Sequence, residues 1–190
     1  MCPDTKALLA YVKLELFFAA ICYYIKINPK PITAMAKKIA EQLIDTLVKS
    51  GVERIYAVTG DSLNEVNEAV RKNDQIKWIH VRHEETGAYA AAAEAQLTGR
   101  PGCCAGSSGP GHVHLINGLY DAHRSGAPVI AIASTIPTGE FGTEYFQETN
   151  TIKLFNDCSY YNEVATTPTQ FPRMLQSACL LYTSPSPRDS

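Results

Sequence analysis

The chain has 190 residues, of which 45% are hydrophobic and 19% are charged, and its formal net charge is −2. This composition is that of an ordinary folded domain with enough apolar residues for a sizeable core. It excludes a highly charged disordered chain. Lys and Arg are neither in excess nor clustered, which excludes a nucleic-acid binder that depends on phosphate neutralisation.

The six cysteines show neither a C-x-x-C pair nor the spacing of a small disulfide-rich domain. Cys103 and Cys104 are neighbours in an apolar run, where cysteine usually acts as a small hydrophobic residue. We therefore expect free thiols, a reducing compartment and a cytoplasmic protein.

Both ends of the chain differ in character from its middle. The N-terminal part has an uninterrupted apolar run from Leu16 to Ile25, too short for a spanning helix of about 20 residues. We interpret residues 1–34 as an upstream extension, with a buried or interfacial helix as the alternative. Residues 179–190 begin with CLLYTSPSPRD, which reads as a translated sequencing adapter. The interpretable domain is therefore 35–178, and we expect it to be truncated at its C-terminus.

Strand-like runs recur along the interpretable domain. They are expected at 55–59, 78–81, 102–105 and 129–133. The last run is continuously apolar, which is typical of a strand buried on both faces of a parallel sheet.

Helix-like segments separate these runs. The first has Ala40, Leu43, Ile44 and Leu47 at helical spacing and ends at Gly51. Ser62 and Glu65 form the S-x-x-E pattern of a capping box at the start of the second. Further helices are expected over 84–97, through Ile116 and Leu119, and more weakly near 151–157 and 168–177.

This alternation predicts an α/β fold, with a doubly wound, mostly parallel sheet and helices on both faces. Ligands bind such sheets at the carboxyl ends of the strands. The candidate segments for a site are therefore 60–61, 83–85, 107–111 and the residues after Ala133.

The turn from Gly106 to Gly111 has the composition of a phosphate-binding loop but the wrong spacing. A dinucleotide fingerprint needs a glycine where His114 stands, and no Lys–Ser/Thr pair follows as in a Walker loop. A nucleophile elbow centred on Ser108 needs glycine in place of Pro110. The turn either brings the backbone close to a small flat ligand or simply joins a strand to a helix.

Four histidines stand in two close pairs, His80 with His83 and His112 with His114. Neither pair has a third ligand at a spacing that favours zinc, and His112 and His114 fall on different helix faces. No metal site is predicted.

Glu84 and Glu85 begin a predicted helix, where the helix dipole stabilises carboxylates by about 0.3–1 kcal/mol. A carboxylate at this point also faces the ligand edge of the sheet, where it would be desolvated and available for proton chemistry. The residues alone leave both roles open.

Seven segments occur in order and together resemble one enzyme family. They are VTGDSLN (58–64), RHEE (82–85), AEAQLTG (93–99), SSGPG (107–111), HLINGLYDAHR (114–124), PVIAIAS (128–134) and FQET (146–149). This set resembles the N-terminal pyrimidine-binding domain of thiamine-diphosphate enzymes over about residues 35–178. The resemblance is closest to pyruvate oxidase and the quinone-linked pyruvate dehydrogenase, and acetolactate synthase is more distant.

The resemblance implies a role for each matching residue. Glu84 corresponds to the catalytic glutamate that hydrogen-bonds the aminopyrimidine ring of the cofactor and activates it. Cofactor contacts are implied for Gly60, Asp61, Ser107, Gly109, Pro110 and His114, and a substrate-pocket position for Phe146 and Gln147. His114 favours the oxidases, because acetolactate synthases usually carry asparagine there. No role is implied for Glu85.

The resemblance also implies parts of an enzyme that lie outside this chain. A C-terminal domain would bind the diphosphate and Mg²⁺, a middle domain would bind FAD, and the site would form between subunits of a homodimer or homotetramer. We therefore expect a fragment, inactive alone, of a thiamine-diphosphate- and FAD-dependent pyruvate oxidase or pyruvate:quinone oxidoreductase that acts on pyruvate or a related 2-oxo acid. An acetolactate synthase fragment, a non-catalytic binding module and a metal-dependent hydrolase are the alternatives. Membrane association of the whole enzyme is left open.

Overall fold

The computed structural model describes the backbone of residues 37–183 and the side chains of residues 37–181. The chain divides into two compact units, Met1–Lys37 and Lys38–Ser190, and almost all of the described residues belong to the second. The interpretation of residues 1–34 lies outside the described residues, as does the part of the predicted tail from 184 to 190.

Four parallel strands form a single sheet in the order β2-β1-β3-β4. The strands are β1 (Arg54–Ala57), β2 (Lys77–His80), β3 (Gly102–Gly106) and β4 (Val129–Ala133). The predicted parallel sheet is confirmed, with each strand end within two residues of its expected place.

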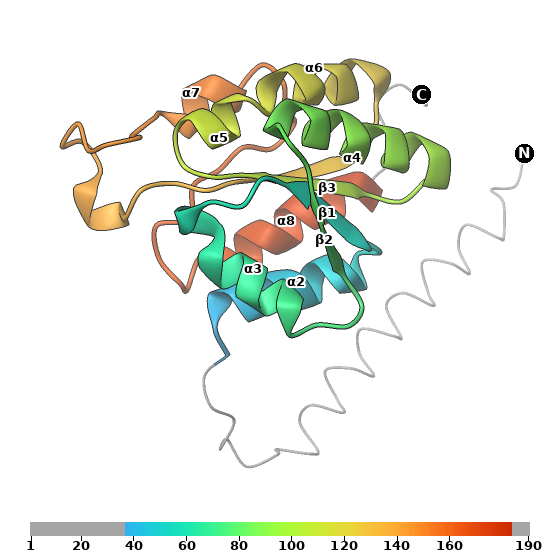
Figure 1. The fold of residues 1–190 in the computed structure, drawn as a ribbon, viewed down its shortest axis with the longest axis horizontal. Helices are drawn as coiled ribbons and strands as arrows, with labels where there is room; N and C mark the ends of the chain where they lie inside the picture. Colours follow the sequence, from blue (N-terminus) through green and yellow to red (C-terminus); the bar gives the residue numbers. More distant parts are fainter. Residues whose placement is uncertain (1–36, 184–190) are drawn as a thin grey trace, which may run out of the picture. The chain divides into compact units, whose positions relative to one another are not determined.

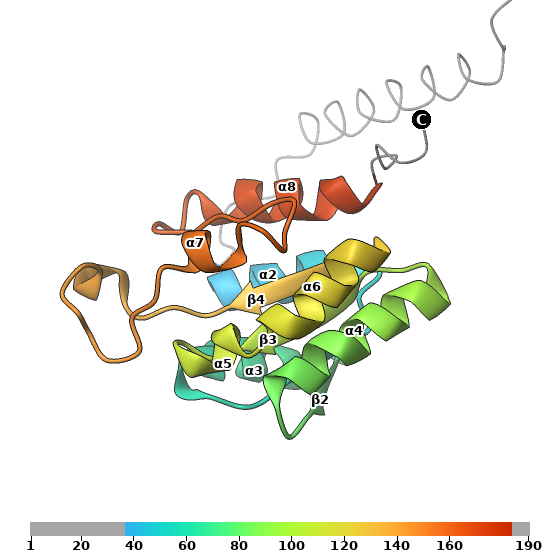
Figure 2. The same cartoon turned by 90° about the horizontal axis from the view of Figure 1, so that it is seen from above.

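Helices cover both faces of this sheet (Figure 1, Figure 2). On one face lie α2 (Ile39–Lys49), α3 (Asn64–Arg71) and α8 (Phe171–Thr183), and on the other lie α4 (Glu84–Thr98), α5 (Pro110–Val113), α6 (Ile116–Ser125) and α7 (Thr151–Phe155). Two short 3-10 turns, η1 (Asp61–Leu63) and η2 (Thr138–Glu140), follow β1 and β4. Among the described residues, no helix has the length and the apolar character needed to cross a membrane.

The core consists of two apolar clusters, one on each face of the sheet. Successive side chains of a strand point to opposite faces, so Cys103 packs with α2 and α3 while Cys104 packs with α4 and α6. Both thiols are fully buried, and burial raises the pKa of Cys104 to about 12. The two cysteines act as small hydrophobic residues, as their neighbours in the sequence predict. Within the described part, Cys158 and Cys179 are also free thiols.

Helix α4 packs closely against both the sheet and α6 because small residues line its contacts. A Cβ atom added to Gly102 of β3 would lie 2.1 Å from the carbonyl oxygen of Ala91. A Cβ atom added to Gly118 of α6 would lie 2.5 Å from the Cβ atom of Ala88. These two contacts fix the position of α4, and therefore the position of Glu84 at its first residue.

Strand β4 differs from the expectation that it is buried on both faces. It is an edge strand of the described sheet, only partly buried, and Ala131 at its centre is exposed. The fully buried strand is β3, which has a neighbour on each side. A continuous apolar run predicts a strand but does not tell where in the sheet the strand lies.

The predicted capping box is wrong. Helix α3 begins at Asn64, after η1, and no side chain caps its first turn. The hydroxyl of Ser62 bonds to the segment after β3 instead, and Glu65 forms an ion pair with Lys38. Ser62 and Glu65 thus bond to residues far away in the sequence and not to the first turn of α3.

We predict that Gly102→Ala lowers the free energy of unfolding by about 1–3 kcal/mol, because the added methyl group overlaps the backbone of α4. The control is Gly139→Ala in η2, where nothing lies within 4 Å of the added atom. Urea unfolding of both variants measures the difference. Equal stability of the two variants would contradict the close packing of α4 on β3.

Candidate functional site

Segments that follow all four strands meet at one edge of the sheet, as expected for parallel strands. Residue Gly60, after β1, touches Ser107, after β3: a Cβ atom on Gly60 would lie 2.3 Å from the Ser107 hydroxyl oxygen. Ser134, after β4, donates a hydrogen bond from its hydroxyl to the carbonyl of Ser62 at 2.9 Å. The residues after β2 lead directly into Glu84.

Glu84 faces the turn between β3 and α5. Its side chain is 12% exposed, and its Oε2 lies 3.0 Å from Nδ1 of His114. Its other oxygen, Oε1, has no hydrogen-bond partner among the described residues and lies 3.4 Å from where a Cβ atom on Gly111 would stand. One carboxylate oxygen is therefore held by His114, while the other is free opposite a residue without a side chain.

The turn itself is a tight glycine-proline-glycine bend. Gly109 has a φ of 67°, which disfavours any residue with a side chain, and Pro110 occupies the first position of α5, where no backbone N–H is needed. The amide of His112 donates to the carbonyl of Ser107 at 2.8 Å and closes the turn. The bend brings Gly111 between Ser107 and Glu84.

Ser62 connects three of the segments at this edge, a role that the sequence analysis missed. Its hydroxyl oxygen accepts the Ser108 amide at 3.0 Å and lies 2.8 Å from the Ser107 hydroxyl. Its carbonyl accepts the Ser134 hydroxyl. Its partners lie 45 to 72 residues away, so no local pattern could have identified them.

The predicted substrate-pocket residues separate in the structure. Gln147 lies against the turn that follows β3. Ser108 donates a hydrogen bond from its hydroxyl to Gln147 Oε1 at 3.1 Å, and Gly109 packs against the Gln147 side chain. Phe146 is 80% exposed. Asp61 is also exposed, at the start of η1.

The histidines combine in a way that differs from the two pairs considered in the sequence. His80 lies exposed at the end of β2, and His112 is buried with its ring nitrogens bonded elsewhere. His83 and His114 come together instead, with ring centroids 4.4 Å apart and ring planes 27° apart.

With Glu84, this pair forms a group of potential metal ligands whose donor atoms lie within 4.8 Å of one another. The lone pairs of imidazole nitrogens lie in the ring plane, so two stacked rings direct them side by side and not toward one ion. The Nδ1 atom of His83 also accepts the Glu85 amide at 3.3 Å. The geometry favours a stacked pair beside Glu84 over a metal centre.

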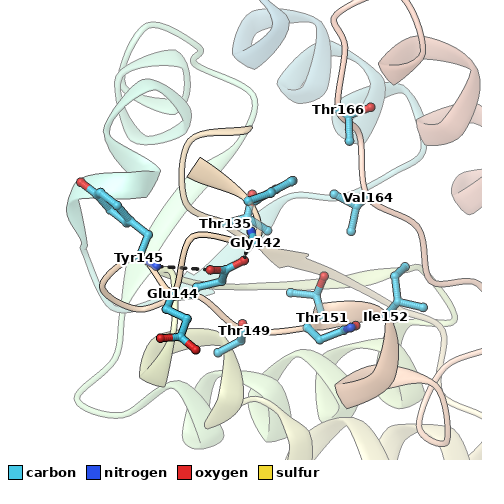
Figure 3. A pocket seen from close by; sticks show the side chains of 12 residues that line it. Thr135, Gly142, Glu144, Tyr145, Thr149, Thr151, Ile152, Val164 and Thr166 are labelled. Atoms are coloured by element: carbon cyan, nitrogen blue, oxygen red, sulfur yellow. Dashed lines mark hydrogen bonds between the residues drawn. The ribbon is translucent and has the colours of Figure 1, made fainter. Parts of the chain in front are cut away.

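A cavity of about 760 Å³ lies nearby, between the residues after β4 and Val164 and Thr166 (Figure 3). Its lining includes Phe141, Tyr145 and Glu148 but does not include Glu84. The Glu84 carboxyl group therefore lies outside this cavity, beside the partly exposed His114 side chain.

We predict that Ser62→Ala lowers the free energy of unfolding by about 1–2 kcal/mol, because the Ser108 amide loses its partner. Glu65→Ala is the matched control: a capping box needs Ser62 together with Glu or Gln at position 65, whereas the observed contacts need only Ser62. Urea unfolding distinguishes the two models. Equal losses of unfolding free energy in the two variants would support the capping box and contradict the linking role of Ser62.

Comparisons with known proteins agree with this geometry. Residues 37–154 match the family described as thiamine pyrophosphate enzyme, N-terminal TPP binding domain. The chain is 55% identical over 141 residues to an uncharacterised 42.6 kDa protein in the isoamylase 3′ region of Pseudomonas amyloderamosa, covering 74% of this chain and 36% of that protein. It is 41% identical over 137 residues to pyruvate oxidase of Lactiplantibacillus plantarum, covering 72% of this chain and 23% of the oxidase.

A third relative is acetolactate synthase 3, chloroplastic, of Brassica napus, with 34% identity over 151 residues, or 80% of this chain and 23% of the synthase. The chain thus spans between about a quarter and about a third of the length of these relatives. Because the family match covers more than half of the chain, and the sheet and its ligand edge are those of an α/β cofactor-binding fold, the chain belongs to the thiamine pyrophosphate enzymes and contains their N-terminal TPP-binding domain.

Proposed function

We propose that Glu84 binds the aminopyrimidine ring of thiamine diphosphate and activates the cofactor. The observation that carries this proposal is the free Oε1 atom opposite Gly111, in a carboxyl group whose other oxygen is already held by His114. A side chain at position 111 would stand in front of this oxygen. The glycine leaves it uncovered, and a flat ring fits the space against the backbone of the turn.

Each neighbouring residue has a part in this proposal. His114 orients the carboxyl group through Oε2, and Oε1 then exchanges a proton with a ring nitrogen. The segment from Ser107 to Pro110 and the residues Gly60 and Asp61 contact the cofactor. When it is bound, thiamine diphosphate supplies the electron sink for decarboxylation of a 2-oxo acid, and the protein supplies orientation and proton control.

We further propose that the chain is part of a thiamine-diphosphate- and FAD-dependent oxidoreductase that acts on pyruvate or a related 2-oxo acid. The identity to a protein named pyruvate oxidase and the histidine at position 114 support this assignment. Phe146 and Gln147 would line the substrate pocket. The Mg²⁺ and FAD sites would belong to other domains.

A second subunit of a homodimer or homotetramer would complete the site. The side chain of His114 is 43% exposed in this chain, although it bonds Glu84 directly, so the surface beside the carboxyl group is open to solvent. A partner domain on this surface would exclude water from the reaction. The chain alone would then bind the ring weakly and would not turn over substrate.

Acetolactate synthase is the second candidate, and the 34% identity to a protein of that name supports it. The two reactions differ in their products. With pyruvate, both reactions release carbon dioxide. An oxidase then passes two electrons from the remaining two-carbon unit to an acceptor, whereas a synthase joins that unit to a second substrate molecule without net oxidation. A product assay on the full-length protein separates them.

We predict that Glu84→Gln in the full-length protein lowers decarboxylation about 100-fold or more while the fold stays intact, because an amide cannot exchange the proton. The matched control is Glu85→Gln, which alters the adjacent carboxylate that accepts a hydrogen bond from Asn117 at 3.2 Å. Steady-state rates measure the effect, and circular dichroism checks the fold. Near-normal turnover of Glu84→Gln, or an equal loss in both variants, would remove Glu84 from this role.

A further inference from the structure

The residues between β4 and α7 leave the sheet and return to it. The excursion, called the 135–148 loop, follows Ser134 and ends before Thr149, and it projects beyond the sheet in both views (Figure 1, Figure 2). The loop contains both described non-glycine residues with positive φ, Glu144 at 57° and Gln147 at 67°. Such conformations are strained for residues with a side chain and persist only where the surroundings enforce them.

Hydrogen bonds within the loop help to hold these two residues in their conformations. The Glu148 carboxylate accepts backbone N–H groups from Gly142 at 2.6 Å and from Tyr145 at 3.3 Å (Figure 3). The amide of Glu148 also donates to the carbonyl of Tyr145 at 2.9 Å. The loop is thus closed on itself, as in compact surface loops whose two ends lie close together.

The two ends of the loop are joined by one side chain, His112. Its Nδ1 lies 2.8 Å from the carbonyl oxygen of Ser134, and its Nε2 lies 2.6 Å from the hydroxyl of Thr149. A carbonyl oxygen can only accept, so Nδ1 carries the proton and Nε2 accepts from Thr149. Burial lowers the pKa of His112, and the hydrogen bond to Ser134 raises it by a smaller amount. Because the net effect is a lowered pKa, the ring is neutral near pH 7.

His112 is 1% exposed and packs edge-on against Phe155, with ring centroids 5.9 Å apart. It belongs to α5, the helix that begins with Pro110 of the glycine-proline-glycine bend. The same four-residue helix therefore holds both the bend and the ends of the loop. The Ser108–Gln147 hydrogen bond is a second link between the bend and the loop.

We propose that His112 is a positioning residue that clamps the ends of the 135–148 loop and sets the position of the loop against the bend. The neutral imidazole does this with one donor and one acceptor. Through Gln147 the clamp also positions a wall of the substrate pocket, and only this last consequence rests on the proposed function.

Hydrogen exchange measured by mass spectrometry, on the chain without any cofactor, tests the clamp. In His112→Leu and Thr149→Val we expect the amides of residues 138–148 to exchange about tenfold faster than in the unmodified chain, because the loop ends lose buried hydrogen bonds. Peptides from α4 serve as the internal reference and are expected to keep their rates. Thr149→Val removes a single hydroxyl, so it reports on the clamp even where His112→Leu does not fold.

Two further variants complete the design. His112→Gln retains a donor and an acceptor and is expected to restore slow exchange in the loop. Thr138→Val alters an exposed threonine within the loop and is expected to change nothing. Unchanged loop exchange in Thr149→Val, equal acceleration of the loop and α4, or failure of His112→Gln to restore slow exchange would each overturn the proposal. None of these outcomes depends on whether Glu84 binds thiamine.

Discussion

The close packing of α4 between the sheet and α6 is the constraint on which the site depends. Glycines on β3 and α6 let the backbone of α4 approach to contact distance, and alanines on α4 fill the remaining space. Glu84 is the first residue of this helix, so the packing decides where its carboxyl group lies. A larger residue at Gly102 or Gly118 would displace the helix and the carboxyl group together.

A second set of contacts places the turn that faces Glu84. Ser62 connects the segments after β1, β3 and β4, and its partners include Ser107 and Ser108, just before the bend. The bend then presents Gly111 to Glu84, and α5 continues from the bend into His112 and the 135–148 loop. The site is thus assembled from residues that lie far apart in the sequence but follow neighbouring strands.

Much of this arrangement could be predicted from the sequence, because the relevant signals are local. The alternation of strand and helix patterns predicted the parallel sheet, and it placed Glu84 at a helix start and Ser107 to Gly111 in a turn after a strand. The prediction that His112 and His114 diverge is confirmed, since the first bonds Ser134 and Thr149 and the second bonds Glu84.

The remaining features depend on contacts between distant residues and could not be predicted. Ser62 was assigned to a capping box because the local pattern fits one, but the stronger partners lie after β3. The edge position of β4 follows from the strand order, which an apolar run does not encode. The stacking of His83 on His114 and the clamp formed by His112 join residues whose spacing carries no signal.

In the proposed site, one carboxylate oxygen of Glu84 stays free for the cofactor ring. A crystal structure of the full-length protein with thiamine diphosphate tests it most directly. We expect a pyrimidine ring nitrogen about 2.6–3.2 Å from Glu84 Oε1, with Oε2 still bonded to His114. A ring bound away from Gly111, or a Glu84 carboxyl group that makes no contact with the ring, would show that Glu84 does not bind the cofactor.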